Sequence, residues 1–213
     1  MDDQRPGRNG SLPRPRRRRN HHGPSRTPRA ANRRPHLSAS PHLEAERIHL
    51  LEAATRGPVL DLACGSGRNA CPAANWGARV VGIDRSAERL DALRSAARAE
   101  GLPLLPVRAD LESQRQIPVR SGSCGAILVF RFLSRPLAPA IVDALAPGGL
   151  LLYETFTFHQ KKLGYGPENP AFLLEDGELP TLFPELKILA HWEGVEERGA
   201  KPEAVARLTA RKT

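Results

Sequence analysis

The feature that most constrains this sequence is a short apolar run that contains an acid and ends in a glycine-rich turn. Residues 58–70 read Pro-Val-Leu-Asp-Leu-Ala-Cys-Gly-Ser-Gly-Arg-Asn-Ala, and a helical pattern follows. This succession is typical of a buried strand, a tight loop and a helix N-terminus, which together bring backbone N–H groups up to a ligand. Gly65 and Gly67 can adopt positive φ and leave no Cβ between the backbone and a bound molecule. The stretch therefore predicts a ligand-binding turn.

Two classes of ligand use such a loop. Residues 65–70 fit the dinucleotide fingerprint G-x-G-x-x-G/A, which alone is a weak signal. Asp61 distinguishes the classes, because a carboxylate in a buried strand is costly unless a neighbouring group compensates it. This acid would repel a pyrophosphate and attract a ligand with an ammonium or sulfonium group, such as S-adenosylmethionine. A tight turn of a parallel sheet without any ligand is the remaining interpretation.

A second acid follows at the spacing expected for a nucleoside site. Residues 79–84 read as a strand, and Asp84 stands at its carboxyl end. In open α/β sheets an acid at this position reaches the ribose hydroxyls of the bound nucleoside. Both ligand classes predict this contact, so Asp84 indicates an adenosine-type ligand without choosing between them.

The pattern Asp61-x-Ala63-x-Gly65-x-Gly67 resembles the first motif of the class I S-adenosylmethionine-dependent methyltransferases. Alanine replaces the first glycine of that motif, and we expect Ala63 to keep ordinary strand geometry. A helix, a Pro-Gly-Gly turn and a strand over residues 137–156 form a second match. Residues 130–137 and 153–157 resemble the small bacterial TehB-like group within this class. Together the matching stretches cover about residues 55–192.

The expected fold is a doubly wound, mostly parallel, seven-stranded α/β sheet, the Rossmann-like methyltransferase fold, with a C-terminal antiparallel hairpin. The sequence pattern predicts strands at 58–63, 79–84, 103–108, 125–130 and 150–156, and hairpin strands at 186–193 and 204–211. It predicts helices at 43–57, 67–76, 86–100 and 137–145. Residues 157–182 are expected to form a long connection at the ligand edge of the sheet, where such loops are usually functional.

The resemblance also implies a set of cofactor contacts. Asp110 would accept a hydrogen bond from the exocyclic amine of adenine, and Leu111 would cover the ring. The complete set of expected S-adenosylmethionine-binding residues is Asp61, Ala63, Gly65, Gly67, Asp84, Asp110, Leu111 and Phe130.

The catalytic residues are less well defined. Methyl transfer from a sulfonium is a direct displacement, so the protein mainly aligns the reactants and excludes water. A side-chain base is needed only if the acceptor must lose a proton. Tyr153, Glu154 and His159 are the candidates at the correct edge. Glu154 could equally be a structural acid paired with Arg131 or Arg135, and His159 a solvent-facing loop residue.

The cysteines argue against both a metal site and a disulfide framework. There are three, Cys64, Cys71 and Cys124, and their spacing does not match that of metal ligands. We therefore expect no metal. The same odd count agrees with a reducing compartment.

The net charge of +9 is concentrated at one end of the chain. Residues 1–42 hold 11 arginines and 2 acids, whereas residues 43–213 hold 21 basic and 21 acidic residues. We predict a disordered Arg/Pro-rich arm over 1–42 and a single folded domain over 43–213, because the arm has too few apolar residues to fold. The arm could bind RNA or address the nucleus, act as a transit peptide, or be an extension without a role. No secretory signal or membrane-spanning run is visible, which favours a cytoplasmic location.

These observations favour an S-adenosylmethionine-dependent methyltransferase that acts on a small-molecule acceptor. Three alternatives remain: an RNA methyltransferase whose arginine arm contacts phosphates, an NAD(P)-dependent oxidoreductase that uses the same loop, and a nucleoside-binding module without catalytic activity. The sequence does not name the acceptor or the oligomeric state.

Overall fold

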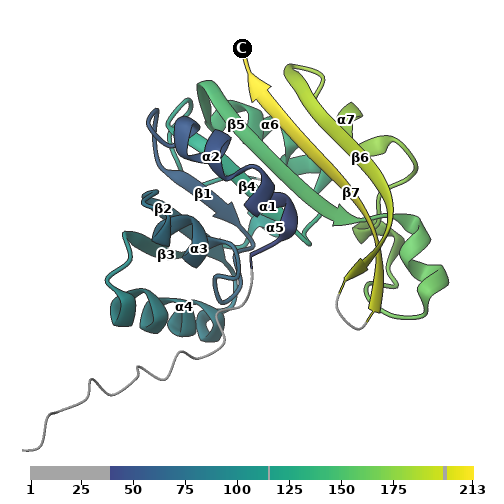
Figure 1. Ribbon diagram of the computed structural model, residues 1–213, viewed down its shortest axis with the longest axis horizontal. Coiled ribbons are helices and arrows are strands. Elements are labelled where there is room, and N and C mark those ends of the chain that lie inside the picture. The colour runs from purple at the N-terminus through teal and green to yellow at the C-terminus, as the bar shows by residue number, and fades with distance from the viewer. Residues whose placement is uncertain (1–38, 115, 199–200) are drawn as a thin grey trace, which may run out of the picture. The chain divides into compact units, whose positions relative to one another are not determined.

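The computed structural model describes residues 39–114, 116–198 and 201–213 (Figure 1). The arm predicted for residues 1–42 therefore lies outside the described residues except for its last four positions, and its disorder stays a prediction. Among the described helices, none is long and apolar enough to cross a membrane.

A single seven-stranded sheet runs through the domain in the order β3-β2-β1-β4-β5-β7-β6. The first five strands are parallel, and β7 runs antiparallel to both β5 and β6. The strands are β1 Val59–Leu62, β2 Val80–Asp84, β3 Leu104–Arg108, β4 Cys124–Phe130, β5 Leu145–Phe156, β6 Leu186–Arg198 and β7 Lys201–Lys212. This order confirms the predicted fold class and places the reversal of strand order between β1 and β4, where open α/β sheets bind ligands.

Helices cover both faces of the sheet (Figure 1). On one face of the sheet, α1, α2 and α3 pack against apolar residues of β1, β4 and β5. On the other face, α6 and α7 pack against the residues of these strands that alternate with them. The helices are α1 Pro41–Ala45, α2 Arg47–Ala53, α3 Ala70–Asn75, α4 Ala87–Glu100, α5 Leu111–Gln114, α6 Ala138–Ala144 and α7 Glu178–Thr181, with 3-10 turns η1 Arg135–Leu137, η2 Phe158–Leu163 and η3 Pro170–Phe172.

The long helix α4 forms as its sequence predicts. The Ser86 hydroxyl caps its start by accepting a hydrogen bond from the Arg89 N–H at 3.3 Å. Gly101 ends it with φ of 64°, a conformation that glycine adopts without strain. Leu90 and Leu93 form its buried face.

The N-terminal part of the domain differs from the expected single helix over residues 43–57. Two short helices, α1 and α2, meet at Glu46, and α1 already begins at Pro41. Ser40 is only 1% exposed, so residues 39–42, which we had placed in the arm, pack against the domain. The reason is tertiary: the Ser40 hydroxyl binds the buried Glu154 of β5, and the Ser40 N–H binds the buried Asn69 just before α3, as described below.

The C-terminal hairpin is longer than predicted. Residues 194–198 and 201–202, which we expected to form part of a turn, continue β6 and β7. The pairing of β5 with β7 ends at Phe156 and Val205, whereas β6 and β7 remain paired as far as Arg198 and Lys201. The hairpin therefore extends past the carboxyl end of β5, toward the edge of the sheet where ligands bind.

Candidate cofactor site

The glycine-rich turn begins with an alanine in an unusual backbone conformation. Ala63 has φ of +54°, so our expectation of ordinary strand geometry at this position is wrong. The left-handed conformation lets the chain leave β1 sharply while the Cys64 N–H still binds the Ile83 carbonyl of β2 at 3.0 Å. Arg131, at the end of the neighbouring strand β4, also has positive φ, at +57°. Strained residues of this kind gather at functional sites, and these two follow adjacent strands.

The two glycines of the turn have different roles. Gly65 has φ of +55°, and the nearest side-chain atom to a Cβ built on it would be the Arg89 Cδ at 4.0 Å, so its outer side is open. Gly67 has φ of +92°, and a Cβ there would lie 2.3 Å from the Leu93 Cδ1 of α4. Gly65 therefore leaves space for a ligand, whereas Gly67 allows the turn to pack against α4.

Asp84 connects the end of β2 to this turn. Its Oδ2 accepts a hydrogen bond from the Gly65 N–H at 2.9 Å, and its Oδ1 accepts one from the Ser86 N–H at 2.8 Å. The residue is only 6% exposed, yet it lines the cavity described below. The same carboxylate can therefore position the loop and offer its remaining lone pairs to a ligand.

Asp61 lies buried in β1, beneath the turn. Its burial raises the pKa of the carboxyl from 3.8 to about 7, although a hydrogen bond from the Ala70 N–H and the positive charge of Arg68 oppose the shift. The Ala70 N–H belongs to the first turn of α3, so this acid occupies the helix N-terminus. Asp61 does not line the cavity, and its direct contact with a ligand stays a prediction.

A cavity of about 260 Å³ lies at the carboxyl ends of β1, β2, β3 and β4. Four of the eight predicted cofactor residues line it, and the other four, Asp61, Gly65, Gly67 and Phe130, do not. Phe130 instead points toward the α1 face, where its ring lies 6.0 Å from that of His42. The lining residues are Ala63, Asp84, Arg85, Arg89, Ala109, Asp110, Leu111, Glu112, Arg131 and Phe132.

Asp110 is one of the residues that line this cavity. Its Oδ1 accepts hydrogen bonds from the Glu112 N–H at 3.0 Å and the Ser113 N–H at 3.3 Å. These backbone bonds lower the pKa of the carboxyl, so it is ionised at neutral pH. Leu111 follows directly and is 4% exposed. The acid and the apolar residue thus line the same cavity, and their contact with adenine stays a prediction.

Sequence reasoning did not assign a cofactor role to the remaining six lining residues. Most of them directly follow a strand or adjoin a predicted acid: Arg85 comes after Asp84, Glu112 lies near Asp110, and Arg131 and Phe132 come after β4. The rule that ligands meet the carboxyl ends of parallel strands was the signal that could have identified them.

The three catalytic candidates lie apart from this cavity. Tyr153 is buried, its hydroxyl donates a hydrogen bond to the Phe132 carbonyl at 3.0 Å, and burial raises its pKa well above the ordinary value. His159 pairs with Asp176 at 2.8 Å in a second cavity of about 240 Å³. Tyr153 therefore positions the loop after β4, and His159 does not line the cavity that contains Asp84.

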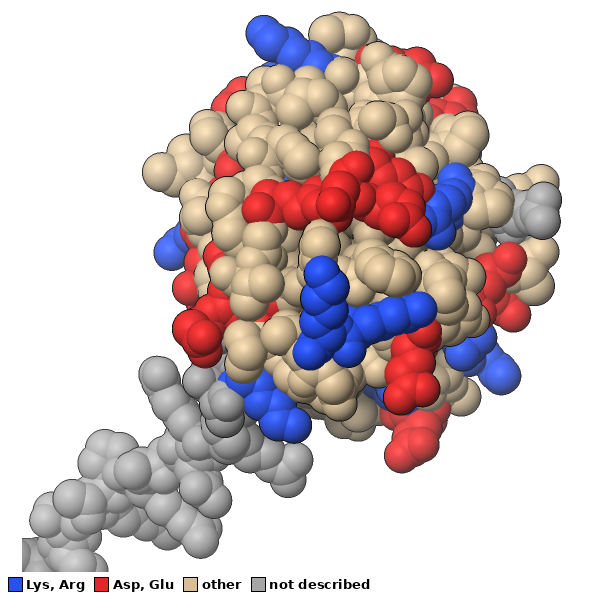
Figure 2. Space-filling view, turned by 90° about the vertical axis from the view of Figure 1, so that its right-hand side faces the viewer, with Lys and Arg blue, Asp and Glu red and all other residues tan. Residues whose placement is uncertain are grey.

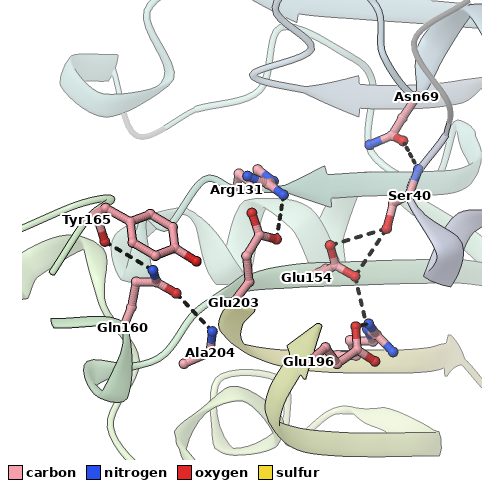
Figure 3. A network of polar contacts seen from close by, with 10 residues as sticks. Ser40, Asn69, Arg131, Glu154, Gln160, Tyr165, Glu196, Glu203 and Ala204 are labelled. Carbon is pink, nitrogen blue, oxygen red and sulfur yellow. Dashed lines mark hydrogen bonds and ion pairs between the residues drawn. The ribbon is translucent and has the colours of Figure 1, made fainter. Parts of the chain in front are cut away.

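Glu154 is the centre of a buried polar network (Figure 3). Both of its carboxylate oxygens accept hydrogen bonds from the Ser40 hydroxyl, at 3.2 and 3.1 Å, and Oε2 also accepts one from the Arg207 Nε at 3.0 Å. The Ser40 N–H in turn donates to the Asn69 Oδ1 at 3.0 Å. Glu154 thus pairs with Arg207 rather than with Arg131 or Arg135, the partners that we had considered. This network connects the chain before α1 to the glycine-rich turn and to the C-terminal hairpin.

Arg131 and Arg135 have other partners. Arg131 pairs with Glu203 of the extended hairpin at 2.5 Å, and Arg135 with Glu178 at 2.5 Å. The Arg135 guanidinium also donates to the Ala171 and Leu173 carbonyls. Both arginines therefore join the segment after β4 to later parts of the chain.

Among the described residues, no three His, Cys, Asp or Glu side chains gather closely enough to hold a metal ion.

The comparisons with known proteins agree with this geometry. A family model described as a methyltransferase domain matches residues 59–149. The chain has no significant match among curated proteins. Similar solved structures include TehB from Haemophilus influenzae, with a TM-score of 0.65 and 19% identity over 79% of this chain and 62% of that one. This chain thus spans less than two thirds of the length of TehB.

Two further solved structures resemble it over nearly their whole length. A SAM-dependent methyltransferase from Methanosarcina mazei has a TM-score of 0.60 and 20% identity over 73% of this chain and 92% of that one. An S-adenosylmethionine dependent methyltransferase from Mesorhizobium loti has a TM-score of 0.60 and 18% identity over 79% and 98%. The fold is that of the methyltransferases among these structures, and residues 59–149 match the methyltransferase domain model. Its structure also resembles TehB, as the sequence motifs indicated.

Proposed function

We propose that the chain transfers a methyl group from S-adenosylmethionine to a small-molecule acceptor, with the donor bound beside the glycine-rich turn in the cavity at the ends of β1, β2, β3 and β4. When bound, S-adenosylmethionine supplies an electrophilic methyl group attached to a sulfonium. The proposal depends on which groups accept hydrogen bonds from the backbone N–H groups of the turn.

Two of these N–H groups already donate hydrogen bonds to carboxylates of the chain itself. Asp84 accepts from the Gly65 N–H, and Asp61 accepts from the Ala70 N–H at the start of α3. A dinucleotide pyrophosphate would need such donors and would meet two acids in their place. A ligand with an ammonium or sulfonium group would instead gain from the charge of Asp84, and its own charge would favour the ionised form of Asp61. This single observation favours S-adenosylmethionine over NAD(P).

The cavity offers groups that suit the rest of the donor. Asp84 would accept hydrogen bonds from ribose hydroxyls through lone pairs that the backbone leaves available. Asp110 would accept from the exocyclic amine of adenine, and Leu111 and Phe132 would enclose the ring. Arg131, held by Glu203, would close the side toward the hairpin.

The chain's own residues would contribute alignment and exclusion of water more than proton transfer. Glu154 is fully buried and engaged by Ser40 and Arg207, and the Tyr153 hydroxyl is held by the loop after β4. Neither is in a position to remove a proton from an acceptor. We therefore expect an acceptor atom that is nucleophilic without a protein base, such as a thiolate or another soft anion.

The identity of the acceptor and the cellular location are also proposals. A small molecule is favoured because the positive excess of the chain lies within residues 1–42, while the rest of the sequence is electrically balanced. A cytoplasmic location fits the three cysteines, which are free thiols. An RNA acceptor would depend on the arginine arm, which makes the two acceptor classes separable by experiment.

The test uses full-length protein and S-adenosylmethionine labelled in its methyl group. Label is followed into a small-molecule extract and, separately, into total RNA. We expect transfer to the small-molecule pool, and we expect it to be unchanged when Arg16, Arg17, Arg18 and Arg19 are all replaced by serine. Label in RNA that disappears in this variant would contradict the small-molecule assignment. Labelling of neither pool would contradict the proposed activity.

A further inference from the structure

The last strand of the sheet has an exposed and unusually apolar edge. β6 is 13 residues long and is hydrogen-bonded to a strand on one side only, among the described residues. Four large apolar side chains on it are exposed: Ile188 at 39%, Leu189 at 42%, Trp192 at 41% and Val195 at 55%. A long exposed edge of this kind is a template for pairing with another strand.

A bulge divides β6 into two parts. The pairing with β7 shifts between Ile188 and Ala190, so Leu189 is an extra residue without a partner on β7. Because paired residues share a face, the register assigns each side chain to one face of the sheet. The face that carries Glu154 and Arg207 holds Lys187, Ala190, Trp192, Gly194 and Glu196, and the opposite face holds Ile188, His191, Glu193 and Val195.

This pattern is complementary to itself when the strand is reversed. With a two-fold axis at Trp192, His191 of one copy lies opposite Glu193 of the other, and Ala190 lies opposite Gly194. Beyond the bulge, which accommodates Leu189 as the extra residue, Ile188 meets Val195 and Lys187 meets Glu196. Every pair lies on a common face, and Lys187 and His191 each lie opposite an acid.

We propose that two copies of this chain associate in antiparallel fashion along β6, with Trp192 on the two-fold axis, so that their sheets join into one. The interface is isologous, as expected for a closed dimer. Trp192 of the two copies would form an aromatic pair beside Arg207, whose guanidinium already lies 4.9 Å from the centre of the Trp192 ring.

Neighbouring registers are less favourable. An axis at Glu193 would place that acid opposite its own copy, and like charges directly opposite are destabilising. An axis at His191 would place Lys187 opposite Gly194, so that Lys187 would no longer face Glu196, the acid that pairs with Arg207 within its own chain. An axis between two residues would set side chains of one face against those of the other. Only the axis at Trp192 matches faces, apolar pairs and charges together.

The surface on this side of the molecule is consistent with a partner of mixed charge. Figure 2 shows acidic side chains gathered in a band across the side of the molecule that carries β6, with basic side chains beside and below this band. A nucleic-acid partner would require a basic surface, whereas β6 itself carries Lys187 near one end and, toward the other, three acids, Glu193, Glu196 and Glu197, followed by Arg198. A reversed copy of the same strand supplies this complement.

The first test is the molar mass of the full chain in solution as a function of concentration, by light scattering after size-exclusion chromatography and by sedimentation. We expect a species of about twice the 23.3 kDa of one chain. Lys187→Glu and Glu196→Lys should each weaken the dimer at least tenfold, because each places like charges opposite one another twice. A 1:1 mixture of the two variants should restore it, because both cross-strand pairs are then again of opposite charge.

The control is Glu197→Lys, the same change at the neighbouring position, which lies opposite Leu186 in this register and should have a smaller effect than Glu196→Lys. A second test places a cysteine on the axis: Trp192→Cys should cross-link to its own copy under mild oxidation, while Ala190→Cys should not. A chain that stays monomeric at every concentration would overturn the proposal. So would a dimer that the mixed variants do not restore and that the Trp192→Cys variant does not cross-link.

Discussion

The Asp84 carboxylate accepts a hydrogen bond from the Gly65 N–H at 2.9 Å, and so ties the end of β2 to the turn that follows β1. Asp84, the predicted ribose ligand, thus also fixes the loop against which S-adenosylmethionine would lie. A nucleoside site and the local fold share one side chain here. Substitution of Asp84 should therefore affect both ligand binding and stability.

We predict that Asp84→Ala lowers the free energy of unfolding by about 1–3 kcal/mol, because the Gly65 and Ser86 N–H groups lose their acceptor. Affinity for S-adenosylhomocysteine should fall at least tenfold. Asp84→Asn keeps one acceptor oxygen and should be destabilised less. Urea unfolding and calorimetric titration measure the two effects. The exposed acid Asp91, changed to alanine, is the control and should alter neither. Unchanged ligand affinity in a folded Asp84→Ala variant would refute the ribose contact.

Asp61 should make stability depend on pH in a defined direction. Burial raises its pKa from 3.8 to about 7, so the folded protein holds this proton more tightly than the unfolded chain. The contribution to stability is complete below about pH 4 and is lost as the pH rises through 7, by on the order of 4 kcal/mol. Urea unfolding across this range should show the loss in the wild type and a flatter profile in Asp61→Asn.

A cationic ligand near Asp61 should reverse part of this loss. Such a ligand favours the ionised carboxylate, so the stabilisation by S-adenosylmethionine relative to Asp61→Asn should be larger above pH 7 than below it. The ligand's own amine titrates in the same way in both proteins, so its effect drops out of the difference between wild type and Asp61→Asn. If the stabilisation by S-adenosylmethionine depends on pH in the same way in both proteins, Asp61 does not interact with the ligand.

The positive φ of Ala63 predicts an unusual gain on substitution by glycine. Ala63→Gly should raise the free energy of unfolding by up to about 1 kcal/mol, because the left-handed conformation disfavours a Cβ. Ala92→Gly, the same change within α4, should instead lower it by about 1 kcal/mol. Thermal and urea unfolding of the pair provide the measurement. A loss of similar size in both variants would contradict the backbone conformation at Ala63.

The network around Glu154 predicts a structural role for this acid. Glu154→Ala should lower the free energy of unfolding by about 3–5 kcal/mol, because Arg207 and the Ser40 hydroxyl lose a buried partner. Glu154→Gln should lose less and should retain methyl transfer in proportion to its folded fraction. Glu88→Ala, a change at an exposed acid of α4, should stay within about 0.5 kcal/mol of the wild type. A folded Glu154→Gln variant without activity would instead indicate a catalytic role.

The fold was predictable because its strongest signals are local. The apolar run of β4, the caps of α4 at Ser86 and Gly101, and the turn at Gly65 each carry their own pattern. The hairpin length was not predictable in this way, since Gly194 and Pro202 indicate a turn. In the structure the Trp192 ring covers Gly194, with ring carbon Cζ2 2.9 Å from where its Cβ would lie, and the strand continues.

The site was predictable only where it follows from strand ends and motif spacing. Asp84, Asp110 and Leu111 meet in one cavity, as the parallel order of β1, β2 and β3 requires. The roles of Glu154 and Tyr153 depend on partners far away in sequence, and no local sequence pattern predicts such pairs. Positive φ at Ala63 has no sequence signal either, since alanine normally avoids it.

The central claim is that the glycine-rich turn serves a cationic nucleoside rather than a dinucleotide. Calorimetric titration of the full chain with S-adenosylmethionine, S-adenosylhomocysteine and NADH tests it most directly. The account predicts saturable binding of the first two, weakened by Asp84→Ala, and no heat of binding with NADH. Saturable binding of NADH with no response to S-adenosylmethionine or S-adenosylhomocysteine would contradict it.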